Sequence, residues 1–370
     1  MDVKTTFLNG DLEEEIYMEQ PEGWVVPGKE GYVCLLKKAI YGLKQASRQW
    51  NVKIHQSLLD LGFTRTYSDA GVYVYRQQRG NSITIVVLYV DDLLLFGDDK
   101  NHIKTVKRTL SRQYKMTDLG AEEYIQSVLE RFQMADCNPS NTPLPSGAVL
   151  VSYDGTASDA DRKRYQSLIG SLMYAMLGTR PDISFAVTHL SRYLSNPSPD
   201  HWNYALYILR YLQGTKSFKI HYKGASNDGL VAYLDSDWAE DKDDRHSTSG
   251  MLFLMAGGAI SWVSRRQPTI SHSSTEAEYK AASDTCCQMA WLRTFSTELG
   301  YDMDFPTAPL FVERRTKHVE VWYHFIREFY AAGHVDIFHV ASADELADAL
   351  TKNVPFAGIE KFCDGVGLGA

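Results

Sequence analysis

The chain has 370 residues, of which 44% are hydrophobic and 23% are charged, and its net charge is −8. This length and composition exclude an intrinsically disordered chain and favour two or three folded domains. The acidic balance argues against a protein that coats nucleic acid non-specifically, because phosphate binding depends on Lys and Arg.

Targeting signals and cysteine usage point to an intracellular protein. No stretch is apolar for long enough to cross a membrane, and residues 1–15 lack the basic start and apolar centre of a secretory signal. The five cysteines show no zinc-type pairing, and their odd number fits a reduced compartment better than a disulfide framework.

The sequence pattern of the first third of the chain predicts strands followed by a helix. Residues 71–76 alternate as a strand does, and the run VVLYVDDLLLF, residues 86–96, predicts a hairpin with Asp91 and Asp92 at or near its turn. Apolar residues recur at helical spacing over residues 102–114.

Proline, serine and glycine concentrate in residues 137–150, which mark the best domain boundary. Helical spacing follows in YQSLIGSLMYAMLGT, ISFAVTHLSRYLS and HWNYALYILRYLQGT, so the middle third is expected to be helical. From residue 229 the pattern changes to strands and then to the helix of residues 273–300. This order predicts a separate C-terminal α/β domain.

Two adjacent acids inside an apolar run are energetically unfavourable unless something compensates them, because a buried carboxylate loses its hydration. One interpretation is a solvated turn, since aspartate is a favoured turn residue. The other is a metal site, with Asp2 on a strand beside the hairpin that carries Asp91 and Asp92. Converging carboxylates suit a pair of Mg²⁺ ions, which clamp the attacking and leaving oxygens of a phosphoryl transfer.

The segments MDVKTTFLNGDLEEEIYMEQPEGW, KKAIYGLKQASRQW and LYVDDLLLFG occur in this order and resemble the reverse transcriptase palm of copia-type LTR retrotransposon polyproteins. The resemblance implies an RNA-directed DNA polymerase in which Asp2, Asp91 and Asp92 bind Mg²⁺ or Mn²⁺. Asp2 and Asp91 would hold the two metals, Asp92 would lie beside them, and Tyr89 would pack near the primer end.

The resemblance also implies a nucleotide and template site. Val3 to Phe7 would form the floor under the nucleotide, and the stretch that follows Ile40 would lie against template and nucleotide through Tyr41, Gly42, Lys44 and Gln45. Ser47 stands where the family usually has proline. Without the resemblance, Lys37, Lys38 and Lys44 read as a solvated helix face. The implied partners are an RNA template, a DNA primer and deoxynucleoside triphosphates, inside a cytoplasmic virus-like particle or the nucleus.

Three later segments, AYLDSDWAEDKDDRHSTSG, SSTEAEYKAAS and ADELADALTK, are similar to the ribonuclease H domain of the same polyproteins. On this match Asp235, Glu278 and Asp348 are the catalytic metal ligands, acting on an RNA–DNA hybrid. Asp237 and Glu276 compete for the first two roles.

His318 and His324 belong to a further matching stretch, RRTKH followed by YHFIRE. Histidine is a common metal ligand, but no cysteine or histidine spacing supports zinc. A role facing nucleic acid or a structural role is therefore preferred for both residues.

The expected fold is α+β: a partial polymerase palm over residues 1–136, a linker and helical thumb or connection over 137–225, a ribonuclease H-like α/β domain over 226–356, and a tail over 357–370. Against the family, three segments are missing: the fingers before Asp2, a glycine-rich hairpin after residue 120, and the stretch before Arg314 that carries the third ribonuclease H acid. We therefore expect crippled activity. The alternatives are a non-catalytic nucleic-acid-binding remnant and a nuclease built on residues 226–356 alone.

Overall fold

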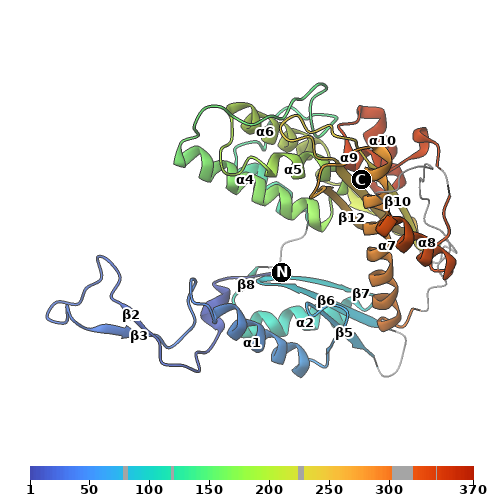
Figure 1. Ribbon diagram of the computed structural model, residues 1–370. Helices are drawn as coiled ribbons and strands as arrows, with labels where there is room; N and C mark the ends of the chain where they lie inside the picture. The colour runs from blue at the N-terminus through green and yellow to red at the C-terminus, as the bar shows by residue number, and fades with distance from the viewer. Residues whose placement is uncertain (78–81, 118–120, 224–228, 302–319, 339) are drawn as a thin grey trace. The chain divides into compact units, whose positions relative to one another are not determined.

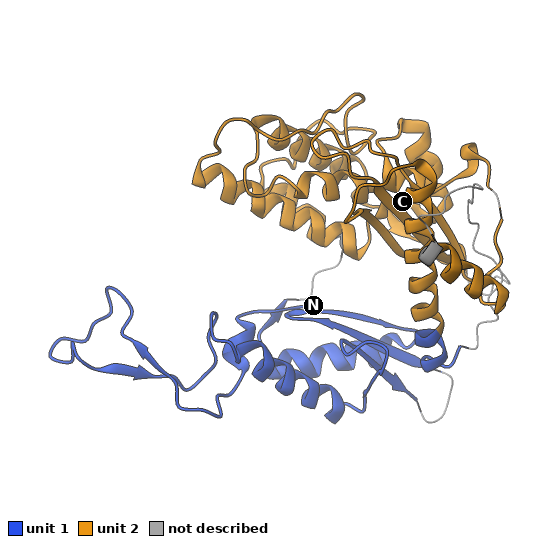
Figure 2. Cartoon of the chain, in the orientation of Figure 1, with its two compact units in different colours: residues 1–119, 294–301 blue, residues 120–293, 302–370 orange. Residues whose placement is uncertain are grey.

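The computed structural model describes residues 1–77, 82–117, 121–223, 229–301, 320–338 and 340–370. The chain forms two compact units (Figure 2). Unit 1 comprises residues 1–119 and 294–301, and unit 2 comprises residues 120–293 and 302–370. Each unit is described by itself.

Unit 1 is built on a six-stranded antiparallel sheet with the strand order β4-β5-β6-β7-β1-β8. Its strands are β4 (Thr64–Arg65), β5 (Val72–Arg76), β6 (Ile83–Tyr89), β7 (Asp92–Gly97), β1 (Asp2–Val3) and β8 (Met116–Thr117). Strands β6 and β7 are the hairpin that the sequence predicts. Among the residues that the structure describes, strand β8 pairs only with β1, which lies between it and β7.

Helices α1 (Ala46–Asp60) and α2 (Lys100–Gln113) cover one face of this sheet (Figure 1). Helix α2 begins after Asp99, whose side chain accepts hydrogen bonds from the backbone N–H groups of Asn101 and His102. The apolar faces of both helices bury a core with every second residue of the strands. Its buried members are Met1, Val3, Trp50, Ile54, Leu58, Phe63, Tyr73, Val86, Leu88, Leu93, Val106, Leu110 and Tyr114.

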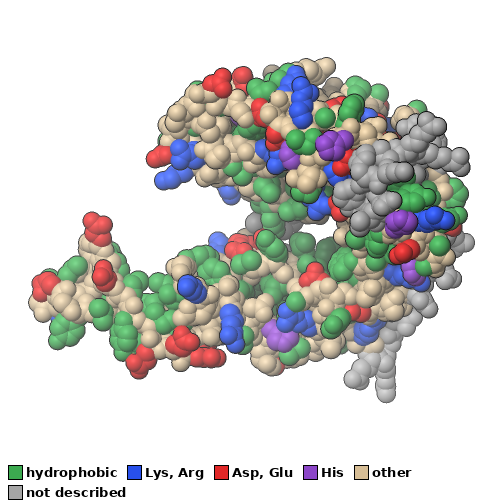
Figure 3. Space-filling view, in the orientation of Figure 1, with side chains coloured by type: hydrophobic (Ala, Val, Ile, Leu, Met, Phe, Trp, Pro, Cys, Tyr) green, Lys and Arg blue, Asp and Glu red, His purple; other side chains and the backbone are tan. Residues whose placement is uncertain are grey.

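A hairpin arm formed by β2 (Tyr17–Glu19) and β3 (Val33–Leu35) projects from unit 1. Its side chains are largely exposed, and Figure 3 shows apolar side chains on its surface. Trp24 is the most exposed of its large apolar residues, at 80%. At the base of the arm, Lys38 and Lys53 both form ion pairs with Asp11 and lower the pKa of that carboxyl to about 2.

Unit 2 begins with four α-helices: α3 (Ala121–Arg131), α4 (Asp159–Gly178), α5 (Ser184–Ser191) and α6 (Pro199–Gly214). Ser158 caps the N-terminus of α4, and Ser198 forms a capping box with His201 at the start of α6. The turn between α4 and α5 contains a fully buried ion pair, in which Arg180 Nη2 lies 2.6 Å from Asp182 Oδ2.

The sheet of unit 2 is an antiparallel meander of β10 (Val231–Ser236), β11 (Thr248–Met255) and β12 (Gly258–Arg266). The remaining helices are α7 (Ser274–Glu298), of which residues 274–293 belong to this unit, α8 (Glu320–Ala331), α9 (Asp348–Thr351) and α10 (Phe356–Gly365). Near the C-terminus, β13 (Leu368–Gly369) pairs with β9 (Lys219–Ile220).

One core joins the helices of residues 121–214 to the sheet and to the last helices of the chain. Leu172 and Leu209 belong to the same buried cluster as Leu252 of β11 and Phe362 of α10. The expected boundary at residue 225 therefore does not coincide with a boundary between compact units. Residues 357–370, expected as a tail, contain most of α10 and all of β13.

The elements themselves follow the sequence pattern. The strands of residues 71–76, 230–239 and 250–264 and the helices of the middle third all occur where their periodicity predicts them. All five cysteines are unbridged. Among the helices that the structure describes, none is long and apolar enough to span a membrane.

Candidate functional site

The acidic pair Asp91 and Asp92 lies where strand β6 turns into β7. Tyr89 and Asp92 face each other across the hairpin, so Val90 and Asp91 form its two-residue turn and Asp92 is the first residue of β7. Val90 has a φ of 53°, in the left-handed region that β-branched residues rarely adopt. The buried Trp50 donates a hydrogen bond from Nε1 to the Val90 carbonyl oxygen at 2.5 Å, which holds this turn to α1.

Strand β1 places Asp2 directly opposite Asp92. The neighbouring residues make the hydrogen bonds: Val3 N–H donates to Asp91 O at 2.8 Å, and Leu93 N–H donates to Met1 O at 2.7 Å. Asp2 and Asp92 are therefore a pair of the closer, non-hydrogen-bonded kind, whose side chains leave the sheet on the same face.

Side chains alternate between the two faces of a sheet along each strand, and this alternation identifies the face that carries Asp2 and Asp92. Val3 and Leu93 lie in the core under the helices, so Asp2 and Asp92 point to the opposite face. Tyr89, which is 77% exposed, shares that face, because Leu88 beside it is buried. The structure thus brings Asp2, Asp92 and Tyr89 into one row across three strands, with Asp91 next to the row in the turn.

The residues expected to contact nucleotide and template lie in two segments, one from β1 into the 3-10 helix Thr6–Asn9 and one just before α1. The rings of Phe7 and Tyr41 meet edge to face with centroids 4.5 Å apart. Gly42 has a φ of 95° with nothing near a Cβ built on it, so the backbone conformation explains this glycine. Lys44 is exposed, and Gln45 Nε2 donates to Glu14 Oε2 at 3.3 Å.

The structure corrects one expectation about these segments and narrows another. Helix α1 begins at Ala46, so Lys37, Lys38 and Lys44 precede the helix and do not form a helix face. The side chain of Val3 is 1% exposed and lies in the core, so only its backbone remains for contact with a nucleotide.

In unit 2, Asp235 at the end of β10 lies beside helix α9, which begins with Asp348. Thr351 donates a hydrogen bond from Oγ1 to Asp235 Oδ2, and Lys352 Nζ lies 2.8 Å from Asp348 Oδ1. Burial, with a smaller contribution from the charge of Asp348, raises the pKa of Asp235, while the Thr351 hydrogen bond acts against the rise. Both carboxylates are therefore already engaged by neighbouring side chains.

Helix α7, which carries Glu278, packs on the face of β10 that carries Leu234. One helical turn after Glu278 come Ala281 and Ala282, which are fully buried in one cluster with Leu234, the residue before Asp235. Glu278 itself is partly exposed. Because Asp235 follows Leu234 in β10, its side chain leaves the opposite face of the strand, and the packing of α7 does not by itself bring Glu278 beside it.

The two competing acids have structural contacts. Asp237 accepts a hydrogen bond from Thr248 N–H, and its burial raises its pKa to about 7 despite that bond. Glu276 is buried, with Oε1 2.8 Å from Lys280 Nζ and Oε2 accepting from His272 N–H at 2.8 Å. These contacts support local structure at the start of β11 and of α7.

Sequence reasoning missed Glu345. Burial raises its pKa to about 7, and the charges of Asp235 and Asp348 add to the rise, whereas a hydrogen bond from the Ala347 N–H opposes it. Its position three residues before Asp348 in ADELAD was the only signal. His324 is exposed on α8, and His318 lies outside the described residues.

The donor chemistry at the first site fits a divalent cation, because Mg²⁺ and Mn²⁺ prefer oxygen ligands and Asp2 and Asp92 present two carboxylates on one face. A full ligand set is not assembled. Within the described part of the chain, no group of three or more His, Cys, Asp and Glu side chains is arranged to hold a metal ion.

Comparison with known proteins decides the family. A family model described as reverse transcriptase (RNA-dependent DNA polymerase) matches residues 1–123. The chain is 34% identical over 312 residues to a putative transposon Ty5-1 protein of Saccharomyces cerevisiae, covering 78% of this chain and all of that protein. Retrovirus-related Pol polyproteins also match from end to end of this chain, with 41% identity over 409 residues for transposon TNT 1-94 of Nicotiana tabacum and 37% over 402 residues for transposon RE2 of Arabidopsis thaliana. The chain belongs to the copia-type Pol polyprotein family of retrotransposons.

This copia-type chain spans 30% of the tobacco polyprotein and 27% of the Arabidopsis polyprotein. The tobacco alignment covers 409 residues, whereas the chain has 370. The tobacco relative therefore carries residues that have no counterpart here.

Proposed function

We propose that residues 1–136 form the palm of an RNA-directed DNA polymerase, that residues 226–356 form a ribonuclease H domain, and that segments missing from within the chain reduce both activities to traces. The helices of residues 137–225 would be the connection between them. The observation that carries the polymerase proposal is the register that sets Asp2 opposite Asp92, with Asp91 in the adjoining turn. The location would be a cytoplasmic virus-like particle or the nucleus.

In this proposal Asp2, Asp91 and Asp92 hold Mg²⁺ or Mn²⁺. Two such ions stabilise the attacking and leaving oxygens of an in-line phosphoryl transfer. Tyr89 shares the face of Asp92 and would contact the primer end. Tyr41, Gly42, Lys44 and Gln45 would contact the template and the deoxynucleoside triphosphate, and the Phe7 ring would support Tyr41.

The ribonuclease H proposal rests on Asp235, Glu278 and Asp348 acting on an RNA–DNA hybrid with the same metals. The hydrogen bond and the ion pair that Asp235 and Asp348 already form weaken this proposal. A cation at Asp235 and Asp348 would have to replace the Thr351 hydrogen bond and the Lys352 ion pair. Two-metal hydrolysis also needs a full ligand set, and the residues that the tobacco relative carries in addition are consistent with the loss of one acid.

Primer extension tests the polymerase proposal. The purified chain, given an oligo(dT) primer on poly(rA) with Mg²⁺ or Mn²⁺, is expected to extend the primer only in traces. Asp91→Asn and Asp92→Asn should abolish those traces, whereas Glu13→Gln, which changes an exposed carboxylate, should keep them. Vigorous extension that disappears in Asp91→Asn would refute the loss of activity and leave the palm assignment intact.

The engaged acids of unit 2 favour one alternative, a non-catalytic nucleic-acid-binding remnant. Such a remnant would bind hybrid equally well before and after Asp91→Asn or Asp235→Asn. It would show no hybrid cleavage with either metal.

A further inference from the structure

Helix α2 carries a basic surface in an acidic protein. Of its 14 residues, five are Lys or Arg and none is Asp or Glu. Lys100, Lys104, Arg108 and Arg112 recur every fourth residue, and all four side chains are exposed. We call these four residues the basic row. Among the described residues, no member of the row forms an ion pair.

The row lies on the side of α2 away from the sheet. Val106 and Leu110 face the core with Leu93, and at 100° per residue the row is centred well over 90° from them. Since Asp2 and Asp92 point to the opposite face of the sheet, α2 and the sheet separate the row from the proposed catalytic carboxylates. A strand of nucleic acid on the row is therefore distinct from one on the catalytic face.

The row works against the stability of its own helix. Like charges four residues apart repel each other, and the row contains three such pairs in succession with no carboxylate between them. Lys100 also occupies the first turn, where the helix dipole disfavours a positive charge. The helix dipole favours Arg112 in the last turn, but no carboxylate within α2 offsets the repulsion along the row. Unfavourable local charges of this kind are expected at functional surfaces.

The chemistry around the row fits phosphate better than a protein partner. The exposed residues between its members are polar, namely Asn101, Thr105 and Ser111. Protein interfaces have an apolar or aromatic centre, which this surface lacks. Four residues of helix rise advance the row by about 6 Å per step, or about 18 Å in all, so several phosphates of one strand would lie along it.

We propose that the basic row of α2 is a second nucleic-acid-binding surface that holds the phosphodiester backbone of a single strand outside the catalytic face. This inference rests on the proposed polymerase function in one respect: that function is the reason for choosing nucleic acid, among polyanions, as the ligand. Binding here is electrostatic and independent of sequence, because the row offers ammonium and guanidinium groups for phosphates and α2 contains no Phe, Tyr or Trp on which a base could stack.

The test measures the salt dependence of binding by the full chain. Fluorescence anisotropy with labelled 20-residue oligouridylate and oligothymidylate, in EDTA, compares the wild type with the triple variant Lys100→Gln, Lys104→Gln, Arg108→Gln. Each phosphate contact contributes about 0.7 to the slope of log affinity against log salt for a single strand, so the triple variant should lose about 2 from the slope. Equal losses with the two oligonucleotides indicate backbone recognition, and a loss with RNA alone would overturn it.

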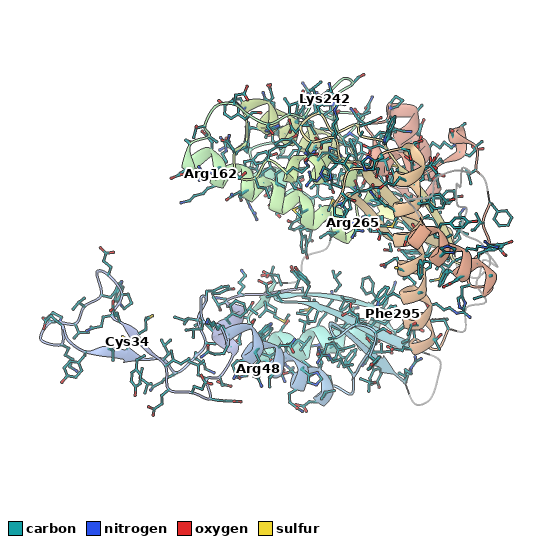
Figure 4. The ribbon with its side chains drawn as sticks, viewed as in Figure 1. Cys34, Arg48, Arg162, Lys242, Arg265 and Phe295 are labelled. Atoms are coloured by element: carbon teal, nitrogen blue, oxygen red, sulfur yellow. The ribbon has the colours of Figure 1, made fainter. Side chains whose placement is uncertain are left out.

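A matched control neutralises three exposed lysines elsewhere: Lys29→Gln on the arm, with Lys223→Gln and Lys242→Gln in unit 2 (Figure 4 labels Lys242). Its net charge equals that of the row variant, and it should keep the wild-type slope. Equal slopes in the two triple variants would overturn the proposal. So would competition by a 20-residue polyglutamate as strong as that by the oligonucleotides.

Folding is checked in the same samples. Because the row destabilises α2, the row variant should unfold at a higher temperature than the wild type while binding more weakly. A footprint on the unmutated protein is the second measurement: bound oligouridylate should protect Lys100 and Lys104 from acetylation and leave Lys29 and Lys242 reactive. No protection would overturn the proposal. The double variant Asp91→Asn, Asp92→Asn should bind with the wild-type slope, so loss of primer extension and loss of row binding are separable failures.

Discussion

Val90 is a β-branched residue in a backbone conformation that glycine adopts far more easily. Such a position costs about 1 to 3 kcal/mol, and the surrounding contacts, including the Trp50 hydrogen bond to its carbonyl, maintain it. The strain lies next to Asp91, so the turn that positions this carboxylate is held in place by its neighbours and not by its own preference.

We expect Val90→Gly to change the free energy of unfolding by less than about 1 kcal/mol, because relief of strain offsets the entropy that glycine adds to the unfolded chain. Val87→Gly, the same deletion in the middle of β6, should cost about 1 to 3 kcal/mol. Urea unfolding of both variants checks this. Equal losses would show that the φ of Val90 carries no strain.

His189 makes the stability of unit 2 depend on pH. Burial, and next the charge of Arg192, lower the pKa of His189 to about 4, below its value of about 6.5 in an unfolded chain. The unfolded state then binds more protons between these values, so this contribution is complete above pH 6.5 and is lost as the pH falls toward 4.

The variant His189→Gln should lack that contribution, and Gln retains a polar group near Thr248 Oγ1, which lies 3.3 Å from His189 Nε2. Urea unfolding at several pH values between 7.5 and 4 should show a steeper fall for the wild type than for the variant. Parallel profiles would mean that His189 is protonated equally easily in both states.

At the scale of elements, the connection between α4 and α5 depends on the buried pair Arg180 and Asp182. The guanidinium binds both carboxylate oxygens and also donates to Thr215 O at 3.0 Å. Removing one member of such a pair leaves a buried charge without its counterpart, which typically costs about 3 to 5 kcal/mol.

Arg180→Met and Asp182→Asn should each destabilise the protein by about that amount, and the double variant should lose less than the sum of the two. Chemical unfolding of the three variants forms the cycle. Strict additivity would show that the two side chains contribute independently of each other.

Elements were predictable from the sequence where periodicity is strong, but strand register was not. The alternation of β6 and β7 predicts a hairpin around Asp91 and Asp92. It does not say whether the turn takes Val90 and Asp91 or both acids, and a shift of one residue moves every side chain to the other face. The structure pairs Asp2 with Asp92, whereas the resemblance favours Asp2 with Asp91 as the metal pair.

At the scale of the molecule, the two compact units could not be derived from the sequence. A helical pattern shows that a segment has an apolar face but not which partner covers it. Leu172 and Leu209 are covered in part by Leu252 and Phe362, from segments up to about half the chain away. The same limit applies to the site of unit 2, where the contacts of Asp235 and Asp348 with Thr351 and Lys352 depend on tertiary packing.

The opposition of Asp2 and Asp92 has a mechanical consequence for the sheet. Two anions across a strand pair repel. Strand β1 is only two residues long, and within the described ranges β8 is attached to the sheet through β1 alone. A divalent cation bound by Asp2 and Asp92 would hold β1 and β7 together. Because it binds the native form only, its binding free energy adds to the free energy of unfolding. Manganese should slow amide hydrogen exchange at Val3 and Leu93 in the wild type but not in Asp92→Asn. Unchanged exchange would mean that this sheet edge closes without help from the ion, and a chelator would then leave it intact.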